Sequence, residues 1–137
     1  MTDLVLIDTS AWIEFLRKPG RADPAVAEEV QKVIVDDRAA TTEHVLVEVA
    51  MGARGEKQLE QWRRMFLDLR LFPVDRKIWL AAAEHGYMLA RKGLGGVPLA
   101  DLLLSSLALE YGLVVLHKEE RHLPKIAKLL GFSEYTP

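Results

Sequence analysis

The chain has 137 residues and a mass of 15.4 kDa, the size of one compact domain. Half of the residues are hydrophobic and 28% are charged, which excludes disordered and fibrous proteins. The formal net charge of −2 excludes the strongly basic profile of a nucleic-acid packaging protein. The chain contains no cysteine, so any metal site must use carboxylate or histidine ligands.

Neither a targeting segment nor a membrane span is expected. The first residues, Met1 to Leu4, contain no basic region ahead of an apolar stretch. The longest nearly apolar run, Gly93 to Leu109, is interrupted by several glycines and by Pro98 and Asp101, so it is typical of buried core. We therefore expect a single cytoplasmic domain over residues 1–137.

Short apolar runs alternate with amphipathic stretches in the first half of the chain. Leu4 to Ile7 is a continuous β-favouring run, typical of a strand buried on both faces. Asp23 and Pro24 suit the N-cap and first residue of a helix, and Thr42 is available to cap another. In chain order we expect a strand at 4–7, helices at 11–16 and 24–35, a strand at 38–42 and helices at 43–51 and 56–69.

The second half repeats this alternation. Asp75 is a suitable N-cap for a helix that ends at Lys92 and Gly93, and Gly131 is a suitable end for the last helix. We expect strands at 71–74 and 113–116, helices at 76–91 and 99–110, and a final helix that ends near residue 130. Apolar strands that alternate with helices predict an α/β domain around a mostly parallel sheet.

Three carboxylates lie in otherwise apolar surroundings. Asp8 directly follows the first strand, at the edge where open α/β sheets place their ligands. Glu48 is the one charge between Val45 and Ala53, and Asp101 is the one charge in the run that ends at Leu109. Aspartate and glutamate are seldom buried without a partner, and no lysine or arginine lies within these apolar runs. The three residues are therefore candidates for one site.

Each carboxylate also has an ordinary structural interpretation. Asp8 could cap a helix, Glu48 could face solvent, and Asp101 could interact with a helix dipole. If they converge instead, two carboxylates about 4 Å apart repel by about 4 kcal/mol at an effective dielectric constant near 20. A raised pKa or a bound cation relieves that repulsion, and an all-oxygen site suits Mg²⁺ or Mn²⁺.

A fourth acidic residue could follow the last of these strands, where Glu119 and Glu120 are both available. Charged residues after a strand are also typical of a solvated loop. The four histidines form no zinc-binding motif, so we expect them at the surface or behind the site residues rather than as ligands; they are His44, His85, His117 and His122.

The segment Leu6 to Arg17, with its Asp-Thr-Ser motif, resembles the opening of a PIN domain of the VapC-type toxin ribonucleases. Three further segments agree in order, and together they cover nearly the whole chain: Thr42 to Arg54, Val97 to Asp101, and Leu116 to Glu119. The resemblance implies a three-layer α/β/α sandwich around the central sheet. It also implies Mg²⁺- or Mn²⁺-dependent endonucleolytic hydrolysis of RNA, of tRNA or rRNA in particular, leaving a 5′-phosphate and a 3′-hydroxyl.

The resemblance implies roles for individual residues. Asp8 and Asp101 would be the firmest metal ligands, and Glu48 would bind the metal directly, bind it through water, or act as a base. Thr9 or Ser10 would supply a hydroxyl that orients a carboxylate or a water. At the last position relatives often have Asp or Asn, whereas this chain has Glu119 or Glu120, so the fourth ligand stays open between these two, with Glu119 favoured by counting from the strand.

The resemblance also implies partners. A cognate VapB-type antitoxin would cover or enter the active-site groove, and the toxin would form a homodimer through its helices. Basic side chains near the site elements are available to hold the RNA backbone: Arg17, Lys18, Arg21, Arg54, Arg91, Lys92 and Lys118.

Other functions compete with a toxin nuclease. A haloacid-dehalogenase-like phosphatase would use Asp8 as a nucleophile, but it needs a second aspartate where this chain has Ser10. A PIN-like module could bind RNA or protein without cutting, although the three intact acidic residues argue against this. A PIN nuclease could also act in RNA maturation, but the short chain without accessory domains favours the toxin.

Overall fold

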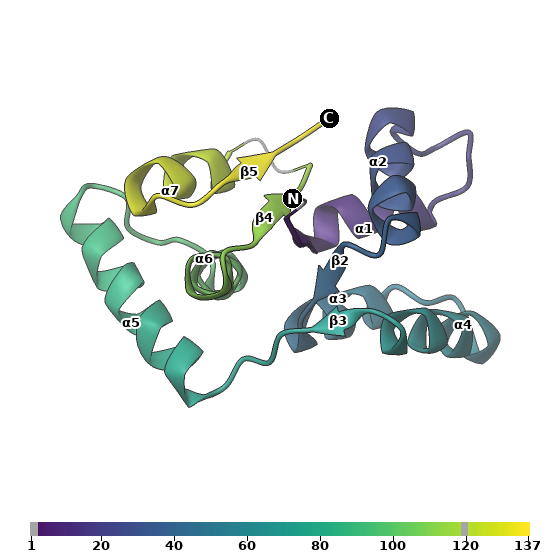
Figure 1. Ribbon diagram of the computed structural model, residues 1–137, viewed down its shortest axis with the longest axis horizontal. Coiled ribbons are helices and arrows are strands. Elements are labelled where there is room, and N and C mark those ends of the chain that lie inside the picture. The colour runs from purple at the N-terminus through teal and green to yellow at the C-terminus, as the bar shows by residue number, and fades with distance from the viewer. Residues whose placement is uncertain (1–2, 119–120) are drawn as a thin grey trace.

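The computed structural model describes residues 3–118 and 121–137 (Figure 1). The strands are β1 (Val5–Ile7), β2 (Ala39–Thr41), β3 (Arg70–Leu71), β4 (Val114–Leu116) and β5 (Glu134–Tyr135). The helices are α1 (Thr9–Leu16), α2 (Pro24–Val35), α3 (Glu43–Met51), α4 (Glu56–Leu67), α5 (Arg76–Arg91), α6 (Leu99–Tyr111) and α7 (Leu123–Leu130). Within the described part of the chain, no helix has the length and apolar character needed to span a membrane.

The five strands form one parallel sheet in the order β3-β2-β1-β4-β5. The central strand β1 pairs with β2 through Val5 and Ala39 and with β4 through Val5 and Val114. The chain builds the sheet outward on the β2 side of β1, then crosses over and continues on the β4 side. The switch in direction therefore lies at β1.

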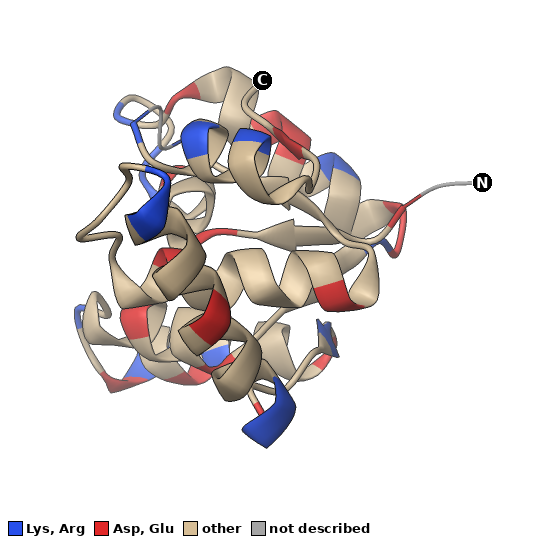
Figure 2. Cartoon of the chain, turned by 90° about the vertical axis from the view of Figure 1, so that its left-hand side faces the viewer, with Lys and Arg blue, Asp and Glu red and all other residues tan. Residues whose placement is uncertain are grey.

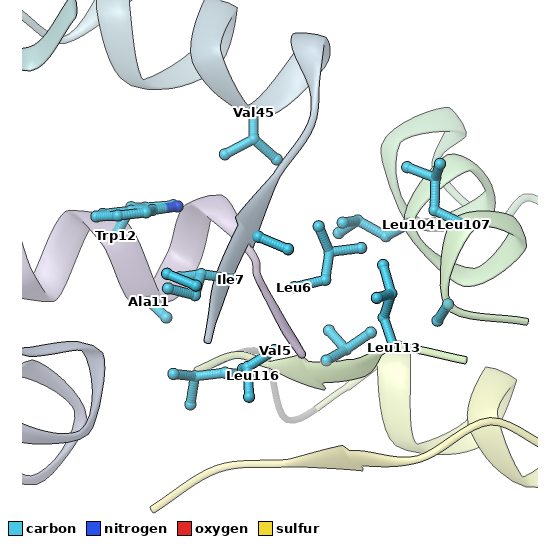
Figure 3. Packing of buried hydrophobic residues seen from close by; sticks show 14 of the residues in the cluster. Val5, Leu6, Ile7, Ala11, Trp12, Val45, Leu104, Leu107, Leu113 and Leu116 are labelled. Atoms are coloured by element: carbon cyan, nitrogen blue, oxygen red, sulfur yellow. The ribbon is translucent and has the colours of Figure 1, made fainter. Parts of the chain in front are cut away.

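Helices cover both faces of the sheet, which confirms the predicted three-layer α/β/α sandwich. Helices α1 to α4 lie on one side in Figure 1, and α5 to α7 lie on the other. Leu6, in β1, is directed toward Leu104 of α6, while Ile7 lies on the side of Ala11 and Trp12 of α1 (Figure 3). This alternation buries β1 on both faces, as the continuous apolar run predicts.

Several predicted helix boundaries follow from local chemistry. The side chain of Asp23 accepts hydrogen bonds from backbone N–H groups in the first turn of α2, and Asp75 does the same for Ile78 in α5. Helix α6 ends at Gly112, whose φ of 65° lies in the left-handed region that favours glycine.

The structure corrects the sequence-based prediction at three places. The two-residue strand β5, Glu134–Tyr135, was not expected, since it has no apolar pattern of its own. Strand β3 lies at Arg70–Leu71 rather than at 71–74, because Arg70 and Leu71 are the residues in register with Ala40 and Thr41 of β2. Thr42 occupies the N-cap position of α3, but its hydroxyl makes no capping hydrogen bond there.

Candidate active site

The carboxyl edge of the sheet collects the segments that carry the predicted site residues. Because all five strands are parallel, residues that follow β1, β2 and β4 lie at the same edge. Asp8 directly follows the central strand, where the order of the sheet reverses. In open α/β sheets this switch point is the usual place for a ligand.

The carboxylate of Asp8 is held in place by hydrogen bonds at the start of α1. Asp8 is the N-cap of α1 and is only 9% exposed. Its Oδ2 accepts hydrogen bonds from the Ser10 backbone N at 3.2 Å and from Ser10 Oγ at 2.5 Å. No hydrogen bond within residues 3–118 and 121–137 occupies its second oxygen, Oδ1, which leaves that atom available to a ligand.

Glu48 lies beside the same end of α1. It projects from α3, and its Oε1 accepts a hydrogen bond of 2.8 Å from Thr9 Oγ1. Thr9 and Ser10 therefore each donate a hydroxyl hydrogen bond to one carboxylate, whereas the resemblance implies such a hydroxyl from one of the two. Unlike Asp8, Glu48 is exposed to solvent.

His44 lies one helical turn before Glu48 and shows that Asp8 and Glu48 share one environment. Burial lowers the pKa of His44, and the negative charges of Glu48, Asp8 and Glu43 partly oppose this shift. Both ring nitrogens are buried without a hydrogen-bond partner in the described part of the chain. His44 is thus a partly buried residue rather than a surface one, and the charges of both carboxylates act on it.

Asp101 comes from the opposite helical layer. It lies in the first turn of α6, and its side chain is 14% exposed. Its Oδ2 is 3.9 Å from Nδ1 of His122, which is the N-cap of α7 and follows β4. This contact places Asp101 at the carboxyl edge of the sheet, on the β4 side.

The predicted fourth acid, Glu119 or Glu120, lies outside the described residues. The preceding residue, Lys118, donates its backbone N–H to Ser10 Oγ at 2.9 Å. The segment after β4 therefore begins beside Ser10, the residue whose hydroxyl donates to Asp8. His117 is 1% exposed, with its Nε2 3.4 Å from Glu134 Oε1, so it is a buried contact to β5 and not a surface residue.

The donor atoms suit a hard divalent cation. They are carboxylate oxygens, and Asp8 is held in a fixed orientation with one oxygen available. In the described part of the chain no three acidic or histidine side chains lie close enough together to hold a metal ion. Mg²⁺ seldom needs three protein ligands, because it keeps several waters and binds through one or two carboxylates together with substrate phosphates. The site therefore fits an ion of this type.

The PIN domain family model matches residues 5–129, most of the chain. The chain belongs to the PIN domain family. The matched range begins at β1 and ends in α7, so the PIN domain includes Asp8, Glu48 and Asp101.

Curated relatives of this PIN-domain chain are ribonucleases by name. VapC ribonuclease Mb1587 from Mycobacterium bovis is 30% identical over 119 residues, which cover 85% of this chain and 87% of that protein. Ribonuclease VapC6 from Mycobacterium tuberculosis is 37% identical over 87 residues, which cover 58% of this chain and 68% of that protein.

Solved structures share the fold over nearly the whole chain. FitAcB from Neisseria gonorrhoeae has a TM-score of 0.75 at 16% identity and covers 96% of each chain. VapBC2 from Rickettsia felis, bound to a DNA fragment from its promoter, has a TM-score of 0.74 at 16% identity and covers 97% of this chain and 98% of that chain. VapC20 from Mycobacterium tuberculosis, a toxin that cleaves the sarcin-ricin loop, has a TM-score of 0.66 at 17% identity, covering 97% of this chain and 99% of that chain.

Proposed function

We propose that this protein is a divalent-metal-dependent endoribonuclease and the toxin of a VapBC-type toxin–antitoxin pair, with one PIN domain over residues 1–137. The observation that carries the proposal is the buried Asp8 carboxylate at the switch point of the sheet, held by Ser10 and neighboured by Glu48. Membership of the PIN family and the VapC ribonuclease that is 30% identical over 85% of the chain support it.

Four residues would hold Mg²⁺ or Mn²⁺ in this proposal. Asp8 and Asp101 are the main ligands, and Glu48 and Glu119 complete the acidic set, with Glu120 as the alternative to Glu119. When bound, the divalent ion supplies a water with a lowered pKa and neutralises charge on phosphate oxygens.

The side chains of the protein prepare this chemistry. The Ser10 hydroxyl fixes Oδ2 of Asp8, which keeps Oδ1 for a ligand, and the Thr9 hydroxyl holds the more exposed Glu48. Glu48 can accept a proton from an attacking water, because a solvent-facing carboxylate reaches water without reorganisation of the core. Buried Asp8 is suited to binding, and exposed Glu48 is suited to proton transfer.

The substrate is RNA, with a tRNA or rRNA segment as the expected target. Acidic and basic segments are interspersed over the helices on the face shown in Figure 2. With a net charge of −2, the protein gains little long-range attraction to RNA, so we expect it to recognise an exposed loop of a structured RNA.

The protein partner is a VapB-type antitoxin, which acts with its toxin in the cytoplasm, and the toxin itself forms a homodimer. Structures of VapBC complexes from Rickettsia felis and Salmonella typhimurium support this assignment. An apolar hollow of about 300 Å³ lies between α4 and α3, and α3 is the helix that carries Glu48. Its lining, which suits the apolar face of an antitoxin helix, includes Leu46, Leu59, Trp62, Phe66 and Leu71.

The proposal is tested by incubating the purified protein with end-labelled tRNA and rRNA fragments. Reactions contain Mg²⁺, Mn²⁺ or EDTA, with Asp8→Asn in parallel. We expect discrete cleavage that both EDTA and Asp8→Asn abolish, because each removes the ion from the site. Asp8→Asn keeps a side-chain oxygen that can cap α1, so the variant should fold. Cleavage that persists in EDTA or in the folded variant would contradict a metal-dependent mechanism at Asp8.

A further inference from the structure

Glu14 is a buried carboxylate that the proposed chemistry does not use. It lies on α1, six residues after Asp8, and is 3% exposed. A carboxylate removed from water in this way is stable only with charge partners or hydrogen-bond donors. The partners of Glu14 therefore indicate what this charge does.

Three groups surround the Glu14 carboxylate. Oε1 accepts a hydrogen bond of 2.9 Å from the Asp23 backbone N and lies 3.4 Å from Lys118 Nζ, and Oε2 lies 3.2 Å from Arg17 Nη1. Lys118 Nζ is also 3.8 Å from Asp23 Oδ2. The ammonium of Lys118 thus lies between one carboxylate of α1 and one at the start of α2.

The backbone of Lys118 contacts the active site. Its N–H donates to Ser10 Oγ at 2.9 Å, and Ser10 Oγ donates to Asp8 Oδ2 at 2.5 Å. Two hydrogen bonds in series therefore join Lys118 to the carboxylate at the switch point. The side chain of the same residue is anchored at Glu14.

We propose that Glu14 and Lys118 are positioning residues that hold Asp8 in its ligand-binding orientation through Ser10. The inference rests on the proposed function, which makes Asp8 a metal ligand. The Glu14–Lys118 ion pair fixes where the segment after β4 begins, the Lys118 N–H then fixes the Ser10 hydroxyl, and that hydroxyl fixes Asp8 Oδ2. Residues that orient a ligand in this manner contribute strongly to metal affinity.

This assignment differs from the expectation that Lys118 holds the RNA backbone. The charge of its ammonium is already balanced by Glu14 and Asp23. A phosphate-binding lysine would instead present its ammonium to the substrate without carboxylates beside it. The two roles predict different kinetic effects, because loss of a phosphate contact raises KM whereas loss of ligand positioning lowers kcat.

The test measures kcat and KM for RNA cleavage and, on the metal-free protein, the Mn²⁺ affinity by calorimetry. The variants are Glu14→Gln, Lys118→Met and Lys118→Arg. Glu60→Gln is the control, since Glu60 also pairs with two cations, Arg63 and Arg64, but its side chain is exposed on α4 and pairs only with residues of its own helix in these contacts. Circular dichroism checks that each protein is folded at the assay temperature.

We expect Glu14→Gln and Lys118→Met to lower kcat and Mn²⁺ affinity by about 10- to 100-fold with little change in KM. Lys118→Arg should retain most activity, because it keeps the positive charge beside Glu14 and Asp23, which Lys118→Met removes. Glu60→Gln should match the wild type. If Glu14→Gln fails to fold, Lys118→Met carries the test, since the Lys118 side chain is 39% exposed.

Three outcomes would overturn the inference. One is a lower melting temperature with unchanged kcat and Mn²⁺ affinity, which would make the pair a purely structural link between α1 and α2. Another is a raised KM at unchanged kcat, which would make Lys118 an RNA-binding residue. The third is a wild type that cleaves RNA but binds no Mn²⁺. A wild type that binds Mn²⁺ without cleaving RNA would contradict the proposed function alone, and the Mn²⁺ affinities would still test the positioning.

Discussion

At the scale of single residues, Asp8 would perform two tasks with different atoms in the proposed site. As the N-cap of α1 it uses Oδ2, which accepts from the N–H and the hydroxyl of Ser10. Oδ1 remains available for a ligand. A residue that both begins a helix and binds a ligand is held more rigidly than an exposed carboxylate, which lowers the entropy lost on binding.

Replacing Ser10 with alanine should separate these two tasks. The Ser10→Ala variant keeps the backbone cap of α1 but loses the hydroxyl that donates to Asp8 and accepts from Lys118 N. We expect cleavage and Mg²⁺ affinity to fall about 10- to 100-fold. The free energy of unfolding should fall by about 1 kcal/mol, because Asp8 loses a hydrogen-bond donor and the exposed Lys118 N–H loses an acceptor. Ser133→Ala, at an exposed serine, is the control, and equal activity of the two variants would contradict this role.

His85 gives the protein a defined pH dependence. Its Nδ1 lies 2.8 Å from Ser106 Oγ, and because the Ser106 hydroxyl donates to Leu102 O, Nδ1 acts as the donor. Burial lowers the pKa of His85 below its ordinary value of 6.5, and Glu84 partly offsets this. The unfolded chain therefore binds a proton more readily than the folded protein. This contribution to stability is complete above the unfolded pKa and is lost as pH falls from there through the lower folded pKa.

The urea concentration at the midpoint of unfolding should accordingly decrease when the pH is lowered from about 7.5 to about 5.5. His85→Gln should show a smaller fall, because the glutamine does not titrate. His44, whose pKa burial also lowers, acts in the same direction and accounts for part of the remaining decrease. The same pH dependence in the wild type and in His85→Gln would contradict the assignment to His85.

At the scale of elements, the end of α6 depends on one glycine. Gly112 has a φ of 65°, and it turns the chain from α6 into β4, which pairs with the central strand. We expect Gly112→Ala to lower the free energy of unfolding by about 1 to 2 kcal/mol, because a side chain is strained in this conformation. The urea midpoint measures the loss.

Gly55→Ala is the matched control for this prediction. Gly55 precedes α4 with a φ of 173°, which is extended backbone, and a Cβ there meets no atom within 4 Å, as is also true at Gly112. The two substitutions thus differ in backbone conformation rather than in crowding. An equal effect of both on the urea midpoint would contradict the conformational explanation.

The elements that the sequence predicts well are those with strong periodicity or a clear cap. Strand β1 appears as an uninterrupted apolar run, and α2 and α5 begin at aspartates whose side chains cap them. Strand β5 escaped prediction because its two residues owe their conformation to pairing with Val115 and Leu116 rather than to their own pattern. Pairing between residues far apart in the chain produces no recognisable pattern in the local sequence.

The same limit applies to the site. Asp8, Glu48 and Asp101 could be singled out because a charge in an apolar run is conspicuous in the sequence. Glu14 also interrupts an apolar stretch, from Ala11 to Leu16, but a single glutamate within a short helix resembles a solvent-facing position, so the sequence does not distinguish it. Its burial results from the packing of α2 and Lys118 around it, which only the tertiary structure reveals.

At the scale of the whole molecule, the proposed site draws its ligands from both helical layers. Asp8 and Glu48 come from the layer of α1 to α4, whereas Asp101 comes from α6 on the opposite side of the sheet. Strands β1 and β2 end at the same edge of the parallel sheet, and the 3.9 Å contact of Asp101 with His122, which follows β4, puts the start of α6 at that edge. The central claim is that the two layers contribute ligands to a single metal-dependent ribonuclease site.

The measurement that tests this claim most directly is the RNA cleavage rate of Asp101→Asn at saturating Mg²⁺. Asp68→Asn, at an exposed aspartate that ends α4, is the control. Asp101→Asn removes one ligand charge at nearly constant volume, so this variant should fold like the wild type. It should cleave RNA at least about 100-fold more slowly, a larger loss than is typical of residues that only orient a ligand. Full activity in a folded Asp101→Asn protein would contradict the account.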